Sequence, residues 1–441
     1  MKKNNQGIYF IGIKGTGMAA LACILHDLGE KVAGSDLSNH FFTEEPLKER
    51  NIPIYNFNEG VFPEDGIVII GNAFLEDFPE VQKARANPSL TCYRYHEYLG
   101  KLMSNYISIS VAGSHGKTTT TGMLSAMLGY NLPTGYLIGD GTGVINEDSR
   151  YLCVESCEYR RHFLAYHPEY ALITNIEIDH VDYFKSTEDY FNAYQEFVAN
   201  IKKALIVFGD DEATRKLEIS VNHYWYGEKE GNDFQALNYI QNSKEMEFDL
   251  YFQGNFKYHF KLPFVGRHLL WNALGVIAIG QLEGLKYEEI EKGLNSFHGV
   301  KRRFVVEECG ENIYIDDYAH HPTEVALTIE AAKSRYPDKK IVAIFKPHRV
   351  SRVYHFADEF AEALNGADEV YLCDFTSIDD QEDGIDIDIH YLQEKIDGAK
   401  VVEENEEGAK QLSFESPAVF LFMSSKDIYE LAEKVKRYQK S

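Results

Sequence analysis

The sequence of 441 residues is poor in cysteine and contains no long hydrophobic run. Its six cysteines form no Cys-x-x-Cys pair and no dense cluster, which argues against a disulfide scaffold and against a zinc site built from thiolates. The first six residues are polar and lead directly into a short apolar segment, and no later stretch is long enough to span a bilayer. We therefore expect a soluble protein of the reducing cytoplasm, with no membrane partner.

Positive charge is also scarce. The chain has 44 lysine and arginine residues against 69 aspartate and glutamate residues, which gives a formal net charge of -25. Such a field repels polyanions, so we expect no nucleic-acid partner, and any phosphate-bearing ligand needs a local binding site. The length and the hydrophobic content of 44% are sufficient for about two to four domains.

The sequence repeats one local pattern three times: a short apolar segment, a glycine-rich or polar turn, and a stretch with apolar residues at helical spacing. This alternation predicts an α/β protein with parallel sheets flanked by helices, in three domains at residues 1–105, 106–304 and 305–441. The expected strands cover residues 8–13, 31–35, 67–71, 107–112, 171–174, 204–208, 313–315, 341–345, 370–373 and 419–423. The aromatic-rich stretch 221–262 predicts shorter antiparallel strands inserted in the second domain, and the acidic run 403–407 predicts a solvated loop.

Residues 113–118, Gly-Ser-His-Gly-Lys-Thr, lie between a strand pattern and a helix pattern. In that setting backbone N–H groups converge on a phosphate at the helix N-terminus, Lys117 reaches the terminal phosphates, and the Thr118 hydroxyl can bind magnesium. The motif is incomplete, because Val111 occupies the position of the first glycine of Gly-x-x-x-x-Gly-Lys-Thr. An ordinary packing turn is the alternative, but the flanking strand and helix favour a nucleotide site.

A second glycine turn, with Gly12, Gly15 and Gly17, also follows a strand pattern and opens a helix. Lys14 stands where a dinucleotide fingerprint has its second glycine, so a nucleotide other than NAD is the better prediction. A pyrophosphate can still bind at this helix N-terminus, with Asp36 after the next strand placed for a ribose or base contact. Glycines needed only for packing are the alternative.

Acidic and histidine groups follow two strands of the second domain. Glu155 ends one apolar segment, and residues 175–180, which end in His180, follow another. Ligands of open α/β sheets bind at this carboxyl edge. A magnesium ion between ATP and a carboxylate substrate needs oxygen ligands, which Thr118 and Glu155 could supply, with His180 as a less usual ligand. Each residue alone could instead be a hydrogen-bonded group at a strand end.

Histidine and basic clusters mark the third domain. Residues 316–322 contain adjacent histidines and end in Pro322, which fits a helix start. Without nearby cysteines, these histidines do not indicate a dedicated zinc site. Residues 301–303 and 349–352 are rich in lysine and arginine, and in so acidic a chain they favour binding of phosphate and carboxylate groups over a merely solvated face.

Together these segments resemble the Mur ligase family, especially its members from Gram-positive bacteria. The resemblance covers nearly the whole chain and is carried by residues 10–18, 113–121, 138–143, 155–163, 174–184, 266–268, 299–304, 316–324 and 347–352. It implies a Rossmann-like UDP-binding domain, a central P-loop ATPase-type domain and a Rossmann-like C-terminal domain that brings the amino acid. The implied activity is ATP-dependent joining of L-alanine to UDP-N-acetylmuramate through an acyl phosphate, with ATP and Mg²⁺ as cofactors, in cytoplasmic peptidoglycan precursor synthesis.

The resemblance also implies roles for individual residues. Lys117, His180, Arg303 and Asp317 would be catalytic. The ATP site would comprise Gly113, Ser114, His115, Gly116, Lys117, Thr118, Thr119, Asn272, Arg303 and Asp317, and magnesium would be held by Thr118, Glu155 and His180. The substrates would contact Gly15, Thr16, Gly17, Met18, Asp36, Asn72, Tyr318, His321, Arg349 and Arg352. The two arginines suit the amino-acid carboxylate, while His180 and His321 are both conceivable bases for the amine.

Two segments of the third domain depart from the family pattern. Lys346 stands where relatives commonly carry glutamine, and residues 423–427, Met-Ser-Ser-Lys-Asp, replace a segment usually written with Gly-Ala-Gly-Asp. The lost glycines restrict the backbone, so any difference from relatives falls on the second substrate. The alternatives are a relative that attaches another amino acid or a recycled peptide, and a non-catalytic nucleotide-binding regulator, against which the intact phosphate-site residues argue. A ligase that adds glutamate to folates fits less well, because the first domain resembles a UDP binder. We expect a monomer or a weak homodimer.

Overall fold

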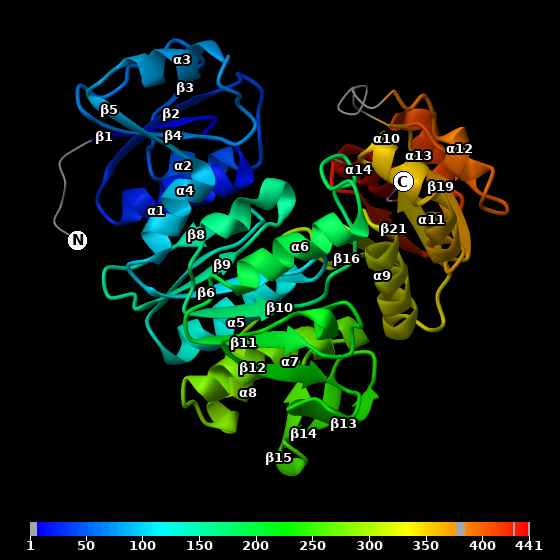
Figure 1. The fold of residues 1–441 in the computed structure, drawn as a ribbon. Helices are drawn as coiled ribbons and strands as arrows, with labels where there is room; N and C mark the ends of the chain where they lie inside the picture. The colour runs from blue at the N-terminus through cyan, green and yellow to red at the C-terminus, as the bar shows by residue number, and fades with distance from the viewer. Residues whose placement is uncertain (1–6, 376–383, 427, 440–441) are drawn as a thin grey trace.

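The computed structural model describes residues 7–375, 384–426 and 428–439. Figure 1 shows three lobes in chain order, the first in blue, the central one in cyan to green and the third in yellow to red. They contain sheets of five, ten and six strands, and the expected three-part α/β architecture with mainly parallel sheets is confirmed. The polar N-terminal residues 1–6 lie outside the described residues. So does Asp427, which belongs to the segment 423–427 that differs from the family pattern. Within the described ranges, no helix is both long and apolar enough to cross a membrane.

The first sheet is parallel throughout, with the strand order β3-β2-β1-β4-β5. Its order reverses at β1, and the first glycine turn follows the carboxyl end of that strand. Such a reversal opens the crevice in which α/β sheets bind ligands. The elements are β1 (Gly7–Ile11), α1 (Thr16–Asp27), β2 (Lys31–Asp36), α2 (Glu44–Glu49), β3 (Ile54–Asn56), β4 (Gly66–Ile70), α3 (Pro79–Ala86), β5 (Leu90–Arg94) and α4 (Tyr95–Met103).

The central sheet has the order β15-β14-β13-β12-β11-β10-β6-β9-β7-β8. Its elements are β6 (Ile107–Ala112), α5 (Lys117–Asn131), β7 (Thr134–Leu137), β8 (Gly143–Val144), β9 (Tyr151–Glu155), η1 (Tyr159–Ala165), β10 (Tyr170–Ile173), α6 (Thr187–Val198), β11 (Ala204–Phe208), η2 (Thr214–Lys216), β12 (Asn222–Gly227), β13 (Phe234–Gln241), β14 (Met246–Phe252), β15 (Asn255–Leu262), α7 (Arg267–Leu282) and α8 (Tyr287–Asn295). The antiparallel prediction for residues 221–262 holds for β13, β14 and β15 but is wrong for β12. That strand pairs in parallel with both β11 and β13 and so continues the main sheet.

The third sheet has the order β16-β17-β21-β18-β19-β20, and only β16 runs antiparallel to its neighbour among the described strands. Its elements are β16 (Val305–Cys309), β17 (Asn312–Asp317), α9 (Pro322–Arg335), β18 (Ile341–Phe345), α10 (Val350–His355), α11 (Ala357–Leu364), β19 (Glu369–Leu372), α12 (His390–Gln393), β20 (Lys400–Val401), α13 (Glu406–Ser413), β21 (Val419–Met423) and α14 (Tyr429–Gln439). The helix start at Pro322 is confirmed. The run 403–407 is not simply a loop, because Asn405 caps α13 and two glutamates form its first turn.

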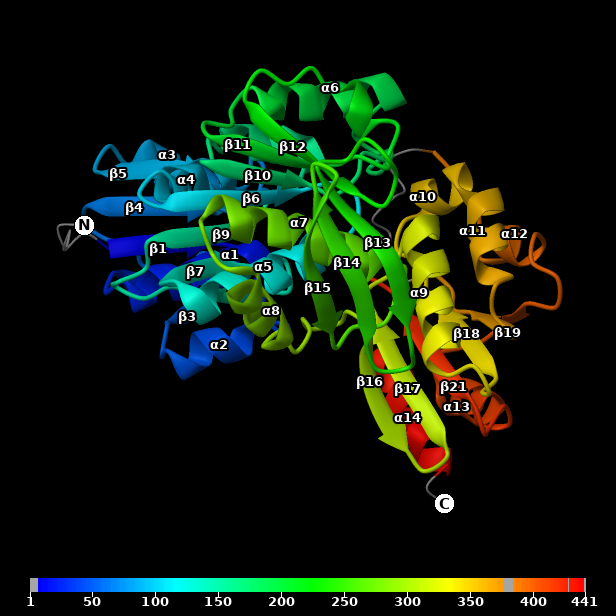
Figure 2. The same ribbon diagram turned by 90° about the horizontal axis from the view of Figure 1, so that it is seen from below.

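Alternating side chains of the central strands fill two different cores. Leu152 and Val154 of β9 belong to one buried cluster, whereas Tyr151 and Cys153 belong to the other. Figure 2 shows α6 on one side of this sheet and α5 and α7 on the other. Because helices cover both faces of the sheet, the sequences of its central strands are apolar at consecutive positions.

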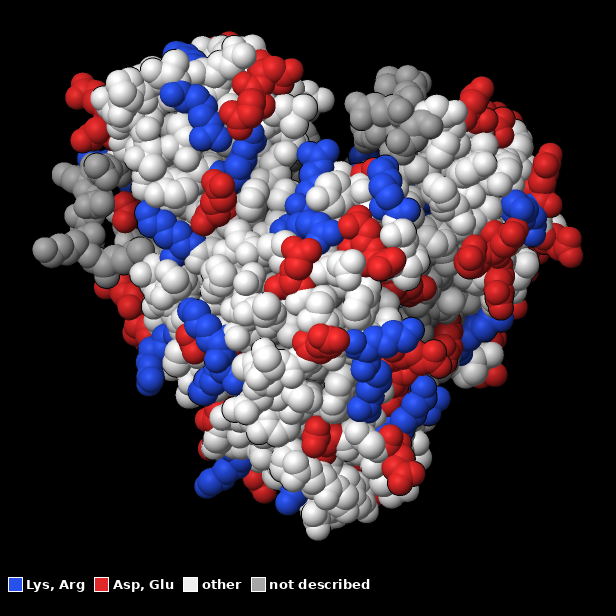
Figure 3. Space-filling model, in the orientation of Figure 1, with Lys and Arg blue, Asp and Glu red and all other residues white. Residues whose placement is uncertain are grey.

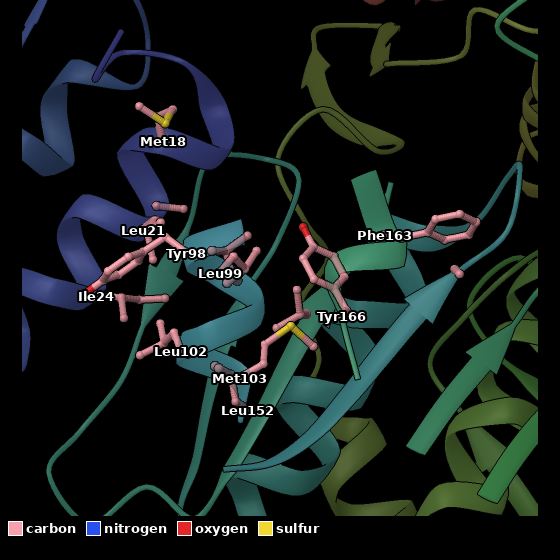
Figure 4. Close-up of a cluster of buried hydrophobic side chains, with 14 of the residues drawn as sticks. Met18, Leu21, Ile24, Tyr98, Leu99, Leu102, Met103, Leu152, Phe163 and Tyr166 are labelled. Atoms are coloured by element: carbon pink, nitrogen blue, oxygen red, sulfur yellow. The ribbon is translucent and has the colours of Figure 1, made fainter. Parts of the chain in front are cut away.

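The first and central lobes share one of these cores. The same cluster that contains the α6 side of the central sheet also contains buried residues of α1 and α4. Figure 4 shows Leu21, Leu99 and Leu102 of these helices beside Leu152 and Tyr166 of the central lobe. The two lobes are therefore joined by apolar packing rather than by a linker alone.

Candidate active site

The expected phosphate-binding turn lies at the carboxyl edge of the central sheet. β6 ends between β9 and β10, residues 113–116 form the turn, and α5 begins at Lys117. Gly113 and Gly116 have φ angles of 136° and 80°, which suit glycine. A Cβ on Gly116 would lie 3.0 Å from the Oδ1 of Asn272. Both glycines are therefore required by the shape of the turn, and Asn272 lies against it.

Lys117 is held at this turn by a buried ion pair. Its Nζ donates to Glu158 Oε2 at 3.0 Å, and to the carbonyl oxygens of Gly113 and Ser114 at 2.5 and 3.0 Å. Burial opposes the charged form of both groups, but their mutual attraction prevails. The pKa of Lys117 is raised, and that of Glu158, which also faces His180, is lowered to about 2. The site thus keeps a charged lysine at the N-terminus of α5, where phosphates bind.

Thr118 and Glu155 come together beside the turn. Thr118 Oγ1 donates to Glu155 Oε1 at 3.0 Å, and the N–H of Gly139 donates to Glu155 Oε2 at 2.7 Å. Arg303, in the segment that leads into the third lobe, has its Nη2 at 3.5 Å from Thr118 Oγ1. Burial raises the pKa of Glu155, and nearby Lys117 acts in the opposite direction. A hydroxyl and a carboxylate placed together match the oxygen ligands that Mg²⁺ prefers.

His180 contacts the same buried carboxylate as Lys117. Its Nε2 lies 3.4 Å from Glu158 Oε1, and its backbone has the unusual φ of 53°. Burial lowers the pKa of His180, but Asp179 and Glu158 outweigh it and raise the pKa to about 10. Its Nδ1 is buried and has no hydrogen-bond partner among the residues that the structure describes. The expected magnesium residues thus form two neighbouring groups, since Thr118 and Glu155 contact each other and His180 contacts Glu158.

Two arginines at the start of α10 reach from the third lobe to the central one. Arg352 Nε and Nη2 donate to Asp179 Oδ1 at 3.1 and 2.8 Å, and both side chains are buried. Arg349 Nη1 lies 2.5 Å from Asp182 Oδ2, which also accepts a hydrogen bond from the hydroxyl of Tyr159. The Nη1 of Arg352 is buried without a partner in the described part of the chain. One donor of this guanidinium is therefore available for a further acceptor.

Arg302 organises the loops at the carboxyl edge of the third sheet. Its Nη2 donates to the carbonyl oxygens of Ser424 and Lys426 at 2.8 and 2.7 Å. The ring of Tyr318 lies 5.0 Å from the guanidinium groups of both Arg302 and Arg303. Arg302, expected to belong to a ligand-binding cluster, thus holds the segment in which the chain departs from the family pattern.

Asp317 and Lys346 make their polar contacts within the third lobe or at its border. Asp317 accepts the N–H groups of Phe304 and Ala319 at 2.8 and 2.7 Å. Burial raises the pKa of Asp317 to about 6, although Arg303 acts to lower it. The Nζ of Lys346 donates to Glu404 Oε2 at 2.8 Å, and the lysine is buried. Its charge is therefore compensated by the acidic run that was expected to be solvated.

The first glycine turn is closed by Asp36. Its Oδ2 accepts the N–H of Lys14 at 2.7 Å, and its Oδ1 accepts the N–H of Leu37 at 2.8 Å. Asn72, at the end of the neighbouring strand β4, is hydrogen-bonded to His96 and His162 at 3.0 and 3.1 Å. Both expected substrate residues thus hold protein structure around the crevice.

One cavity of about 720 Å³ is lined by all three lobes. Of the expected residues, it brings together Thr16, Ser114, Gly116, Lys117, Thr118, Glu155, His180, Arg303 and Tyr318. The others do not line it: Gly15, Gly17, Met18, Asp36, Asn72, Gly113, His115, Thr119, Asn272, Asp317, His321, Arg349 and Arg352. Met18 is buried in the shared core, and His115 and His321 pack against each other. Figure 3 shows lysine and arginine side chains gathered in the notch between the first and third lobes.

Sequence reasoning assigned no role to several acidic residues that hold this site. Glu158, Asp179 and Asp182 pair with Lys117, Arg352 and Arg349 respectively. These carboxylates all lie within segments 155–163 and 174–184, which carried the resemblance. The available signal was that each cationic residue expected at the site needs an anion when it is buried.

A central sheet with a Gly-Lys-Thr turn between two further α/β lobes defines a three-domain nucleotide-binding protein. The chain matches the models described as "Mur ligase family, catalytic domain" at residues 7–107, "Mur ligase middle domain" at residues 111–280 and "Mur ligase, glutamate ligase domain" at residues 302–425. The chain belongs to the Mur ligase family, and it is thus an ATP-dependent amide ligase of peptidoglycan precursor synthesis.

Solved structures agree over nearly the whole length. The UDP-N-acetylmuramate-alanine ligase MurC of Thermotoga maritima is 28% identical, with 98% of this chain and 99% of that chain covered and a TM-score of 0.82. A murein peptide ligase of Psychrobacter arcticus is 22% identical, with 98% of each chain covered and a TM-score of 0.72. The MurF ligase of Thermotoga maritima, solved in complex with ADP, is 19% identical, with 93% and 96% covered and a TM-score of 0.65. The last two similarities establish the fold alone.

Proposed function

We propose that this ligase joins L-alanine to the lactyl carboxylate of UDP-N-acetylmuramate and converts ATP to ADP and phosphate. The observation that carries the proposal is the cavity in which Ser114, Gly116, Lys117 and Thr118 face side chains of the first and third lobes. Such a cavity can bring a phosphate donor and two further substrates together. The similarity to the alanine ligase of Thermotoga maritima, over 98% of this chain, supports L-alanine as the acceptor.

In this proposal the domains at residues 1–105, 106–304 and 305–441 bind UDP, ATP and the amino acid. The phosphates of ATP bind the N–H groups of the turn and Lys117, with Asn272 near the base. Thr118 and Glu155 would hold Mg²⁺, and His180 would add a nitrogen ligand through its unpartnered Nδ1 once it loses the proton that Asp179 and Glu158 stabilise. When bound there, the ion neutralises negative charge between the phosphates and the carboxylate substrate.

The protein contributes mainly by positioning and by charge. The lactyl carboxylate attacks the γ-phosphate, and Lys117 and Arg303 stabilise the charge that develops on its oxygens. The neutral amine then attacks the acyl phosphate, phosphate leaves, and the amine loses a proton. His180 is held protonated by its acidic neighbours, whereas burial and the nearby His115 keep His321 neutral by lowering its pKa to about 3. His180 is thus already charged, and His321 is too weak a base and does not line the cavity, so neither histidine takes the role of base in this proposal.

The third lobe provides the donors for the acceptor carboxylate. Arg352 has one buried Nη1 without a partner in the described ranges, and Arg349 lies nearby at the start of the same helix. The free Nη1 can donate to one oxygen of that carboxylate while Nε and Nη2 stay on Asp179, and such a charge-assisted hydrogen bond is strong. The size of the pocket alone would distinguish L-alanine from other amino acids only weakly, since one methylene changes the binding free energy by about 1–3 kcal/mol. Residues 424–426 differ from the family pattern, and this difference favours a second candidate function, a ligase for another amino acid or a peptide.

The test is phosphate release from ATP and Mg²⁺ with UDP-N-acetylmuramate, run in parallel with L-alanine, glycine, L-serine, a muropeptide-derived tripeptide and no acceptor. Mass spectrometry identifies each adduct. We expect release and adduct formation chiefly with L-alanine. A clear preference for another acceptor would replace L-alanine by that acceptor, and the absence of any adduct would reject the proposed reaction.

A further inference from the structure

A cluster of two buried histidines, one buried glutamate and one partly exposed glutamate lies where the third lobe meets the central one. His115 belongs to the phosphate-binding turn, and Glu177 follows β10 of the central sheet. His321 immediately precedes α9 of the third lobe, and Glu324 lies in the first turn of that helix. One ligand atom from each of His115, Glu177 and His321 lies within 4.8 Å of the other two. None of the roles proposed for ATP or Mg²⁺ accounts for this grouping.

His321 is the unusual member of the cluster. It is 1% exposed, and both of its ring nitrogens are buried without a hydrogen-bond partner among the described residues. Its ring lies 4.5 Å from that of His115 and 5.1 Å from that of Phe356. A buried polar atom without a partner lowers the stability of the folded state by about 1–3 kcal/mol. The imidazole of His321 has two such atoms, which indicates that it binds a ligand.

The groups around the cluster resemble those that hydrogen-bond to metal ligands and orient them. His115 Nε2 lies 3.0 Å from Glu177 Oε2, and its other nitrogen, Nδ1, lies 3.5 Å from Glu324 Oε1. The hydroxyl of Thr323 is 2.8 Å from both carboxylate oxygens of Glu177. Metal-bound histidines commonly turn their second nitrogen to a carboxylate, and metal-bound carboxylates are themselves hydrogen-bonded.

We propose that His115, Glu177 and His321 form a binding site for a divalent transition-metal ion, with zinc as the best-suited ion. Two imidazoles and one carboxylate suit zinc, whereas Mg²⁺ prefers a shell of oxygen ligands. With metal–ligand bonds of about 2.1 Å, tetrahedral coordination would draw the three ligand atoms to about 3.4 Å from one another. The three ligand atoms already lie within 4.8 Å of one another, so no pair would have to approach by more than about 1.4 Å. A water molecule would take the fourth position.

The site would tie two lobes together. His115 and Glu177 come from the central lobe and His321 from the third, so the ion binds fully only when the lobes are in contact. Binding would therefore stabilise the closed arrangement by mass action. This inference does not depend on which amino acid the enzyme uses.

Zinc binding to the full-length protein provides the test. A second group, Cys157, Glu158 and His180, could also take zinc, so the measurements use the C157S background. Metal-stripped protein is titrated with zinc against a chromophoric chelator at saturating Mg²⁺, with and without H321Q. The matched control is H320Q, which changes the neighbouring histidine of the same loop.

We expect one zinc site in the C157S protein, unchanged with H320Q and weakened at least about tenfold with H321Q. Cobalt in place of zinc should give the visible spectrum of a four-coordinate nitrogen and oxygen site, and zinc should make the protein more compact in small-angle X-ray scattering. Equal zinc affinity with and without H321Q would overturn the proposal. If H321Q does not fold, X-ray absorption of zinc bound to the C157S protein decides, because a shell without two imidazoles would equally reject the site.

Discussion

The ion pair between Lys117 and Glu158 provides the sharpest test of how this site is stabilised. The Nζ–Oε2 distance is 3.0 Å, and the glutamate side chain is 0% exposed. Replacing Lys117 by methionine keeps most of the length of the side chain and removes its charge, which leaves a buried carboxylate with one cation fewer. Removing one partner of a buried pair costs about 3–5 kcal/mol. We expect the lower end, about 3 kcal/mol, because His180 Nε2 still lies 3.4 Å from the other oxygen of Glu158.

The double variant K117M/E158Q separates the two contributions of the lysine. Glutamine fits the same space without charge, so the double variant should regain at least about 2 kcal/mol of the stability that K117M loses. Phosphate release should not return, because the lysine that is proposed to bind the phosphates is still missing and only Arg303 remains. We expect both K117M and the double variant to release phosphate about 10²–10³-fold more slowly than the wild type.

Urea unfolding followed by circular dichroism measures the first effect, and phosphate release measures the second. The single variant E158Q is the matched control and completes the double-mutant cycle. If K117M were as stable as the wild type, or if E158Q did not restore the stability of K117M, the pair would contribute nothing of the expected size. A double variant that regained activity would show that the lysine acts only through Glu158.

Four further results are expected. E155Q should raise the Mg²⁺ concentration needed for half-maximal phosphate release at least about tenfold, and an unchanged requirement would remove Glu155 from the metal site. R352K should raise the KM for the amino acid about tenfold while leaving that for ATP within about twofold, because lysine cannot replace the guanidinium fork; equal effects on both would contradict this role. The pKa of Asp317 is about 6 in the folded state against an ordinary 3.8, so the folded state binds the proton of this carboxyl more tightly than the unfolded state does. The free energy of unfolding should therefore fall as pH rises from about 4 to 6. D317N should reduce that fall by up to about 2–3 kcal/mol relative to the wild type. K346Q should change the preference for L-alanine over glycine less than about threefold, since Lys346 is paired with Glu404; a tenfold change would show that it faces the acceptor.

The local sequence pattern predicted the strands well where turn residues flank an apolar segment. The strands at residues 107–112, 204–208, 341–345 and 419–423 have the predicted bounds, because each run is buried on both faces and ends at polar or glycine residues. The direction of β12 could not be predicted in the same way. Its sequence resembles that of the antiparallel strands beyond it, and direction depends on which strand it pairs with, which is a tertiary property.

The site shows the same division between local and distant information. The turn at residues 113–118 was predicted because neighbouring residues suffice to form it. The partners of the arginines could not be predicted, because Arg352 and Asp179 are 173 positions apart and meet only when two lobes are in contact. Asp36 illustrates a further limit: its position at the end of β2 suggested a ligand contact, but its oxygens accept the backbone N–H groups of Lys14, in the glycine turn, and of the adjacent Leu37.

The two interfaces of the central lobe differ in kind, and this difference identifies the part that moves. One buried apolar cluster runs from α1 and α4 into the central sheet, so separating these lobes would expose apolar surface to water. Among the described residues, no buried cluster joins the central and third lobes; their contacts include the ion pair of Arg352 with Asp179 and that of Arg349 with Asp182. When such groups separate, water solvates both partners, so opening costs much less than exposing a core. The third lobe is therefore the one that we expect to move. Tyr318 and the α10 arginines would move with it, so the proposed acceptor site would be complete only when that lobe is closed.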